Sequence, residues 1–150
     1  MQLAAFRYRE EHLVETALLR IKKRLDAGAD GETAVLLIQE HVVAISEAFA
    51  ERCAAEWFTA AEAAAPDAAK PLLARLGDLS LLSRLEAHTA WFLETDYFEA
   101  GKTRAIRKEV EALIAEIAPH AREIVEAFAI PAACLAAPIA FFDPAHPTYE

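Results

Sequence analysis

Apolar residues recur every three or four positions along most of the chain, which is the spacing of one face of an α-helix. The first such run covers about Leu3 to Ala27, and Gly28 follows it where a helix would end. A second run extends from about Glu32 to Glu62, and Asp30 is placed to cap its start. The inward stripe of this second helix is expected to consist of Ile38, Val42, Ile45, Phe49, Cys53 and Trp57.

The remaining helices follow the prolines at 66 and 71. The pattern predicts helices from about Pro71 to Phe92 and from about Lys102 to Ile117, joined by the connector LETDYFEAGK. Pro119 opens a last helix, because proline suits the first helical turn. Runs of alternating strand formers are not seen. The sequence therefore predicts an all-α fold, an antiparallel bundle of about four to five helices, as one domain over residues 1–142 with a tail at 143–150.

Composition and charge narrow the range of partners. The 150 residues suffice to bury a core, and the formal net charge of −9 would repel a phosphate backbone, so nucleic acid is not an expected partner. No uncharged apolar run is long enough to span a bilayer, so a membrane is not expected either. The two cysteines, Cys53 and Cys134, are far apart and are expected to be free thiols. These features predict a cytoplasmic location.

Motifs for catalysis or metal binding are not found in the sequence. The five histidines are scattered, without an HExxH motif or a glutamate three residues ahead of a histidine. The carboxylates alternate as on a solvated helix face, and there is neither a glycine-rich phosphate loop nor a GxSxG turn. The residues themselves therefore indicate no catalytic group and no metal site.

Three features point instead to an interface. The basic run KTRAIRK, with Arg104 and Arg107, opens a helix, where the helix dipole disfavours cations. The run RIKKR, in contrast, ends a helix, and the dipole alone accounts for it. Four aromatic residues lie within WFLETDYF, and one core stripe cannot hold them all, so some are expected to face a partner: Trp91, Phe92, Tyr97 and Phe98.

The third feature is the uncharged segment AFAIPAACLAAPI, which follows the last helix and contains Ile130, Leu135 and Ile139. Such a segment in an acidic chain either closes the core or docks onto something that this chain does not contain.

The order of these features resembles the C-terminal helical domain of acyl-CoA oxidases, the flavin enzymes of fatty-acid β-oxidation. The similar segments are LSRLE, WFLE, the following YF, the basic helix, PHA, EAFAIP and LAAPI, and earlier AAFRYREEHLVETALLRIKKRLDAG with IQEHVVAISEAFAER. The resemblance covers nearly the whole chain.

The resemblance implies packing and dimer contacts for this domain. In the family, FAD is bound by an upstream β-domain with neighbouring helices, and the catalytic glutamate also lies upstream. It therefore implies FAD in the full enzyme, no cofactor and no catalytic residue for this chain alone, and inactivity in isolation. The implied partners are the upstream flavin-binding region, in the same or a separate chain, and a second copy in a homodimer. The ending Thr148–Tyr149–Glu150 is not an SKL-type peroxisomal signal, which again favours the cytoplasm.

Two other functions are compatible with the residues. The chain could be a free-standing helical interaction module derived from such a domain. It could also bind a small ligand inside the bundle, but the stripes carry few convergent polar groups, which favours a packed core over a pocket.

Overall fold

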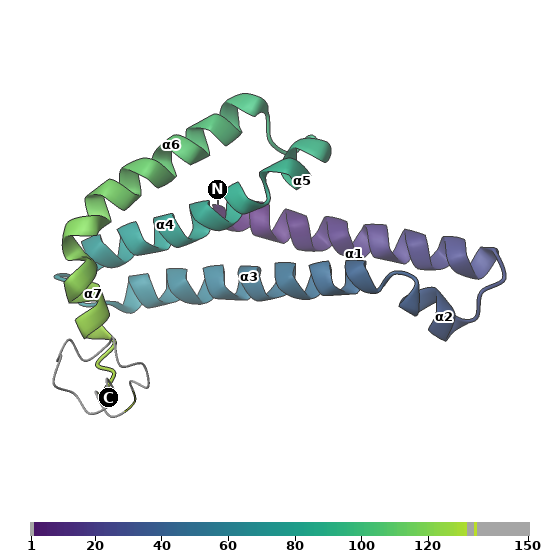
Figure 1. Ribbon diagram of the computed structural model, residues 1–150, viewed down its shortest axis with the longest axis horizontal. Helices are drawn as coiled ribbons and strands as arrows, with labels where there is room; N and C mark the ends of the chain where they lie inside the picture. Colours follow the sequence, from purple (N-terminus) through teal and green to yellow (C-terminus); the bar gives the residue numbers. More distant parts are fainter. Residues whose placement is uncertain (1, 132–133, 135–150) are drawn as a thin grey trace, which may run out of the picture. The chain divides into compact units, whose positions relative to one another are not determined.

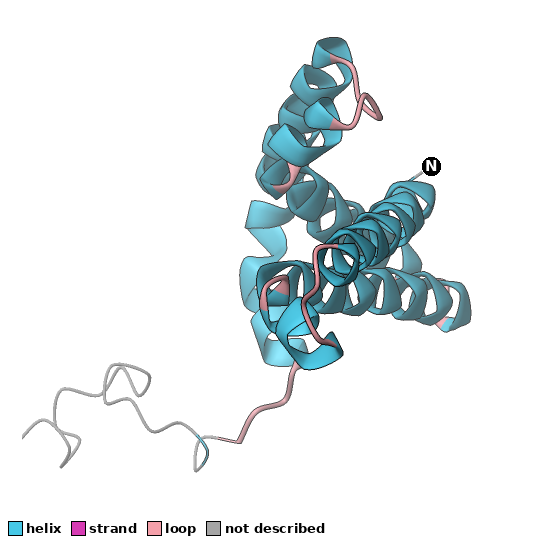
Figure 2. Cartoon of the chain, turned by 90° about the vertical axis from the view of Figure 1, so that its right-hand side faces the viewer, coloured by secondary structure: helices cyan, strands magenta, loops and turns pink. Residues whose placement is uncertain are grey.

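The computed structural model describes residues 2–131 and residue 134, and their regular structure is helical throughout (Figures 1 and 2). The chain divides into two compact units, residues 1–114 and 115–150, and each is treated by itself below. The all-α prediction is confirmed. In chain order the helices are α1 (Gln2–Asp26), α2 (Gly31–Leu36), α3 (Gln39–Ala64), α4 (Lys70–Ala87), α5 (Thr89–Glu94), α6 (Ala100–Ile117), the 3-10 turn η1 (Ala118–His120) and α7 (Ala121–Ala127).

Helix α1 follows its sequence pattern closely. Phe6, Leu13 and Ala17 are buried on one face, as their spacing predicts. After the helix ends at Asp26, Gly28 adopts a φ of 93°, a left-handed conformation that glycine takes without steric cost.

The predicted second helix is divided in two, so the prediction of one continuous helix is wrong at this point. Asp30 does cap the first piece, α2, since its Oδ1 accepts a hydrogen bond from the Thr33 backbone N–H at 2.9 Å. The chain then leaves helical geometry at Ile38, whose φ is −122° and ψ is 17°. This bend buries Ile38 together with Ala34 of α2, so burial of these two side chains accompanies the break.

The predicted inward stripe of α3 is also wrong for most of its members. The fully buried positions are the alanines Ala48 and Ala55, while Phe49 is 51% and Trp57 is 73% exposed. Small side chains let α1 and α3 lie close together, and that contact takes precedence over the burial of the larger side chains that come one or two residues later in the sequence. Of the predicted stripe, Ile38 is buried, Ile45 and Cys53 are half-buried, and Val42 is exposed.

Helix α4 runs antiparallel to α3 and packs on it (Figure 1). Gly77 is buried at this contact and lies close to the Phe58 ring. A Cβ atom at this position would lie only 2.9 Å from Cδ1 and Cε1 of Phe58, so the contact requires glycine's lack of a side chain. The helix predicted to reach Phe92 is interrupted at His88, and the last turn forms the separate helix α5.

Helix α6 carries the predicted apolar stripe. Ile106, Val110 and Leu113 are buried, and Ile106 shares a cavity lining with Leu82 and Leu85 of α4. In the second unit, Pro119 lies in η1 ahead of α7, near the predicted helix start. The predicted boundary between the domain and its tail, at residue 143, lies outside the described residues.

The close approach at Gly77 gives a test of the α3–α4 contact. Gly77→Ala should lower the free energy of unfolding by about 1–3 kcal/mol, because its methyl group would overlap the Phe58 ring. Urea unfolding followed by circular dichroism measures this loss. Gly101→Ala on α6, which meets nothing within 4 Å, serves as the matched control and should be neutral or stabilising. Equal effects of the two substitutions would contradict the contact.

Candidate functional site

The aromatic stretch forms a cluster at the junction of α5 and α6. The Phe92 and Phe98 rings are buried, with centroids 4.4 Å apart. The backbone N–H groups of Tyr97 and Phe98 both donate to the Phe92 carbonyl, at 3.0 and 3.1 Å. Asp96, directly before Tyr97, has a φ of 54°, a left-handed conformation that Asp tolerates better than most residues. This local reversal folds both aromatic rings back over α5.

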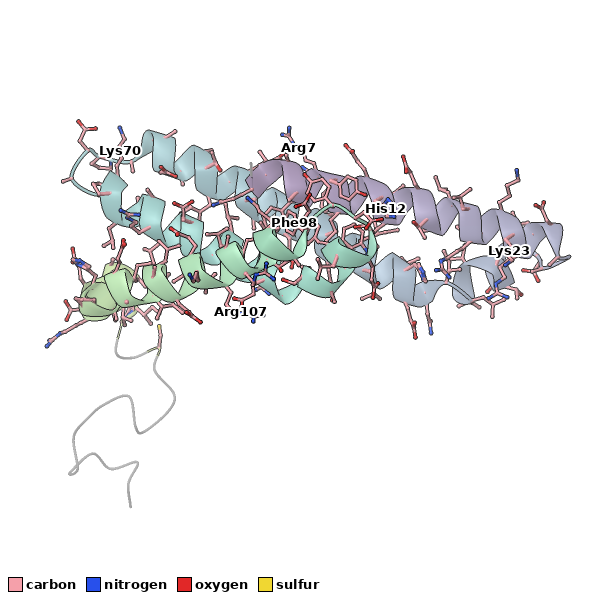
Figure 3. The ribbon with its side chains drawn as sticks, turned by 90° about the horizontal axis from the view of Figure 1, so that it is seen from above. Arg7, His12, Lys23, Lys70, Phe98 and Arg107 are labelled. Carbon is pink, nitrogen blue, oxygen red and sulfur yellow. The ribbon has the colours of Figure 1, made fainter. Side chains whose placement is uncertain are left out.

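Two side chains of α1, Tyr8 and His12, complete the aromatic cluster, and His12 and Phe98 are labelled in Figure 3. Tyr8 stacks on Tyr97 with centroids 4.1 Å apart, and His12 meets the Trp91 ring edge-to-face at 5.5 Å. Trp91 and Tyr97 are half-buried by these contacts. The aromatic stretch therefore fixes α5 against α1 inside the first unit, and a further contact with a partner stays a prediction.

A buried ion network, which the sequence did not reveal, lies beside this cluster. Arg9 is only 5% exposed, and its Nη1 donates to Glu51 Oε2 at 3.0 Å. The other oxygen of Glu51 lies 3.0 Å from His88 Nε2. The Arg9 guanidinium also lies 5.9 Å from the centroid of the Trp91 ring. One carboxylate thus joins α1, α3 and the end of α4.

Burial dominates the electrostatics of Arg9. Desolvation lowers the pKa of its guanidinium, and the Glu51 carboxylate partly opposes this shift. Its Nε has no hydrogen-bond partner among the described residues. A signal was present in the sequence, since Arg9 stands three residues after Phe6 and four before Leu13, on their helical stripe.

A cavity of about 530 Å³ adjoins this network. Its polar lining mixes two carboxylates with one guanidinium and one imidazole. Glu51 and His88 of this lining are the residues that also bind each other and Arg9, so the cavity borders the contacts that join the helices. The lining consists of Phe6, Glu47, Ala50, Glu51, Ala54, Phe58, Ser80, Leu81, Arg84, Ala87 and His88.

A second set of ion pairs fixes the antiparallel register of α1 and α3. Arg52 donates to Glu10 through Nε and to Glu56 through Nη1, the latter at 2.9 Å. Arg7 Nη2 also bonds Glu56, at 2.9 Å. The hydrogen bond from Arg7, together with the charge of Arg52, lowers the pKa of the Glu56 carboxyl. These pairs are internal to the first unit.

The basic start of α6 is partly neutralised by the unit itself. Arg107 Nε lies 3.1 Å from Glu86 Oε1, and both side chains keep some exposure. Arg104 is exposed and makes no ion pair with the part of the chain that the structure describes. Arg104 therefore remains accessible to an acidic partner group.

The predicted docking segment is described only at its beginning. Ile130 is 58% exposed, and Leu135 and Ile139 lie outside the described residues. Val125 and Phe128 of the same unit are also exposed, at 69% and 71%.

The described residues contain neither a cluster of metal-binding side chains nor a helix that could span a membrane. Within residues 2–131 and 134, there is no group of three or more His, Cys, Asp or Glu side chains that could hold a metal ion. In the same residues, no helix is both long and apolar enough to cross a bilayer.

The first unit is helical, and its central polar groups Arg9, Glu51 and His88 bind one another. Comparison with known proteins then gives its family. A family model described as acyl-CoA oxidase matches residues 1–143. The chain is also 31% identical, over 149 residues, to the peroxisomal acyl-coenzyme A oxidase 2 of Arabidopsis thaliana.

The chain belongs to the acyl-CoA oxidase family, as its sequence features predict. The match covers 99% of this chain and 21% of the Arabidopsis relative, so the chain spans about a fifth of that protein's length. No solved structure matches the chain.

The lowered pKa of Glu56 predicts a pH dependence of stability. The folded state favours the charged Glu56 carboxylate, so this group adds to the free energy of unfolding at pH values above its ordinary pKa of about 4.5. That added stability is lost as the pH falls through the lower pKa that the group has in the folded state. The destabilisation caused by Glu56→Gln should therefore be larger at pH 7 than at pH 3. Urea titrations at both pH values measure it.

Glu111→Gln on α6 is the control for this experiment. Glu111 is exposed and makes no ion pair with the described residues, so its substitution should have the same small effect at both pH values. A Glu56→Gln effect that does not change with pH would contradict the ion pairs with Arg7 and Arg52.

Proposed function

We propose that this chain is the C-terminal helical domain of an FAD-dependent acyl-CoA oxidase of fatty-acid β-oxidation. In this role it supplies packing and dimer contacts, while the catalytic base and the flavin site belong to an upstream flavin-binding region in the same or a separate chain. One observation carries the proposal: the family match extends over residues 1–143, yet the segment equals only 21% of the Arabidopsis oxidase.

The described geometry supports a packing role. The ionic side chains at the centre of the first unit, Arg9, Glu51 and His88, bind one another across three helices. The Glu51 carboxylate, whose side chain is 15% exposed, is therefore used for structure, and a substrate would have to break these contacts to reach it. This arrangement suits a domain that shapes and supports an active site formed by other residues.

The sequence of the first unit offers no glycine-rich phosphate loop for a flavin dinucleotide. The first unit contains only isolated glycines, Gly28, Gly31, Gly77 and Gly101, and no glycine-rich loop at a helix start that could bind the phosphates of a dinucleotide. The cavity of about 430 Å³ beside α6 is lined mostly by Ala5, Leu82, Leu85, Tyr97, Phe98 and Ile106. We therefore assign no FAD-binding residue within the described part of the first unit, residues 2–114.

Location and activity follow from the same proposal. The Arabidopsis relative is named as a peroxisomal protein, whereas a cytoplasmic location remains the prediction for this chain. The chain alone should not oxidise acyl-CoA, because neither the flavin site nor the base is assigned to it.

Isolation of the protein from its natural source tests the proposal. Intact mass and visible absorbance are recorded on the same sample, and any released cofactor is identified by chromatography. A flavin band, together with a much larger chain or a co-purifying partner, is the expected result. A colourless protein with the mass of these 150 residues alone would contradict it and would favour the free-standing interaction module.

A further inference from the structure

A small cavity lies where the end of α1 meets the break between α2 and α3. Its volume is about 140 Å³. The end of α1 lies beside α2 (Figure 1), and Lys23 is labelled there in Figure 3. The lining combines three basic side chains of α1 with two apolar side chains of the break and one imidazole of α3. These residues, which we call the basic cavity, are Arg20, Lys23, Arg24, Leu37, Ile38 and His41.

The three cations come together because of their spacing on α1. Steps of three and four residues place Arg20, Lys23 and Arg24 on one side of the helix. Lys22 belongs to the same basic run but is not part of the lining. The break at Ile38, which the sequence pattern did not predict, brings the start of α3 to the same cavity.

The cations of the basic cavity are not neutralised by the first unit. None of the three forms an ion pair with the described residues, and the lining contains no carboxylate. Acidic side chains occur nearby in the sequence, but Asp26 and Glu40 are exposed and outside the lining. Asp30 caps α2, since its two oxygens accept from the backbone N–H and the hydroxyl of Thr33. The positive charge of the cavity therefore has no internal partner.

The helix ends do not balance this charge. The dipole of α1 places about half a negative charge at its C-terminal end, whereas that of α3 places about half a positive charge at its N-terminal end. Both ends border the basic cavity, so the two contributions oppose each other. In addition, Ile38 at the N-cap of α3 makes no side-chain capping hydrogen bond to the first N–H groups of that helix. The dipole of α1 is therefore not the whole account of the run RIKKR.

The donor groups of the basic cavity match a phosphate group. A phosphate monoester carries about 1.5 to 2 negative charges near neutral pH and has three strong acceptor oxygens. Two guanidinium forks can bind such oxygens in pairs, an ammonium adds a third charge, and the imidazole of His41 has an N–H donor. A carboxylate, with one charge and two oxygens, would leave part of this set unused.

Size and net charge agree with the same ligand class. A volume of about 140 Å³ equals that of roughly five water molecules, so the cavity has room for one phosphate group with the rest of the ligand outside. The formal net charge of −9 repels anions from most of the chain. A cavity in which three cations meet without an acid is therefore a distinct place on this surface.

We propose that the basic cavity binds the phosphate group of a small molecule, either inorganic phosphate or an organic phosphate monoester. Arg20 and Arg24 supply paired hydrogen bonds, Lys23 supplies a point charge, and His41 supplies a further donor. Binding at this cavity does not depend on the proposed function, because all of its residues lie in the first unit.

Calorimetry of the 150-residue chain with inorganic phosphate and, separately, with glycerol 3-phosphate tests the site. A chloride buffer of constant ionic strength keeps the screening equal for both anions. Saturable binding of one anion per chain is expected, with acetate at least about tenfold weaker. Tighter binding of glycerol 3-phosphate assigns an organic monoester as the ligand, and the reverse order assigns the free anion.

Substitutions of α1 locate the binding. Arg20→Gln and Arg24→Gln should each weaken phosphate binding by at least about fivefold, because each removes charge-assisted hydrogen bonds to the anion. Arg24→Lys keeps the charge but loses the guanidinium fork, so it should also weaken binding. Lys22→Gln is the matched control: it removes one charge from the same run outside the lining and should stay within about twofold of the unsubstituted chain. Circular dichroism verifies that every variant remains helical.

Three results would overturn the phosphate site. The first is the absence of saturable binding of either phosphate at millimolar concentration. The second is an equal loss in Lys22→Gln and Arg24→Gln, which would show attraction to the charge of the whole α1 end. The third is acetate binding as tight as phosphate binding. Each of these results leaves the proposed function standing, since that function is tested by intact mass and flavin absorbance.

Discussion

The buried pair of Arg9 and Glu51 sets the arrangement of the first unit. A guanidinium that is 5% exposed requires a carboxylate at a fixed place, and this requirement holds α1 and α3 in one register. His88 reaches the same carboxylate from the end of α4, and the Trp91 ring lies near the guanidinium, so α4 and α5 are positioned by the same group. The alanines at 48 and 55 allow the close approach that this pair needs.

This constraint also determines what faces outward. Once the ionic and small residues of α3 turn toward α1, Trp57 is left 73% exposed, and the Phe49 ring, 51% exposed, lies at the edge of the contact, 5.1 Å from the Arg52 guanidinium. A helix that buries alanine and exposes tryptophan is poorly optimised for an isolated unit, but it suits a domain covered by another part of an enzyme. The buried alanines and the exposed aromatic side chains of α3 are thus two consequences of one choice of register.

The periodicity of the sequence predicted the helices well and their faces less well. Helices α1 and α6 appear where their apolar stripes place them, because each has one clear stripe. The breaks at Ile38 and His88 carry no glycine or proline, so local propensity could not reveal them. On α3, side-chain hydrophobicity alone predicts that Trp57 is buried in preference to Ala55. The close contact with α1 instead buries the small side chain of Ala55 and leaves Trp57 exposed. Arg9 binds Glu51, which lies 42 residues further along the chain, and Tyr97 stacks on Tyr8, which lies 89 residues earlier. No local sequence pattern indicates such distant partners. The place of Arg9 on the stripe of Phe6 and Leu13 did, however, indicate that its side chain is buried.

A double-mutant cycle on Arg9 and Glu51 tests the central claim most directly. The free energy of unfolding is measured for the unsubstituted chain, for Arg9→Met, for Glu51→Leu and for the double variant. Glu51→Leu alone should cost about 3–5 kcal/mol, because it leaves a buried guanidinium unpaired, and the double variant should recover much of that loss. A coupling energy above about 1.5 kcal/mol is the predicted result. Additive effects, with a coupling below about 0.5 kcal/mol, would show that the helices are held together without this pair.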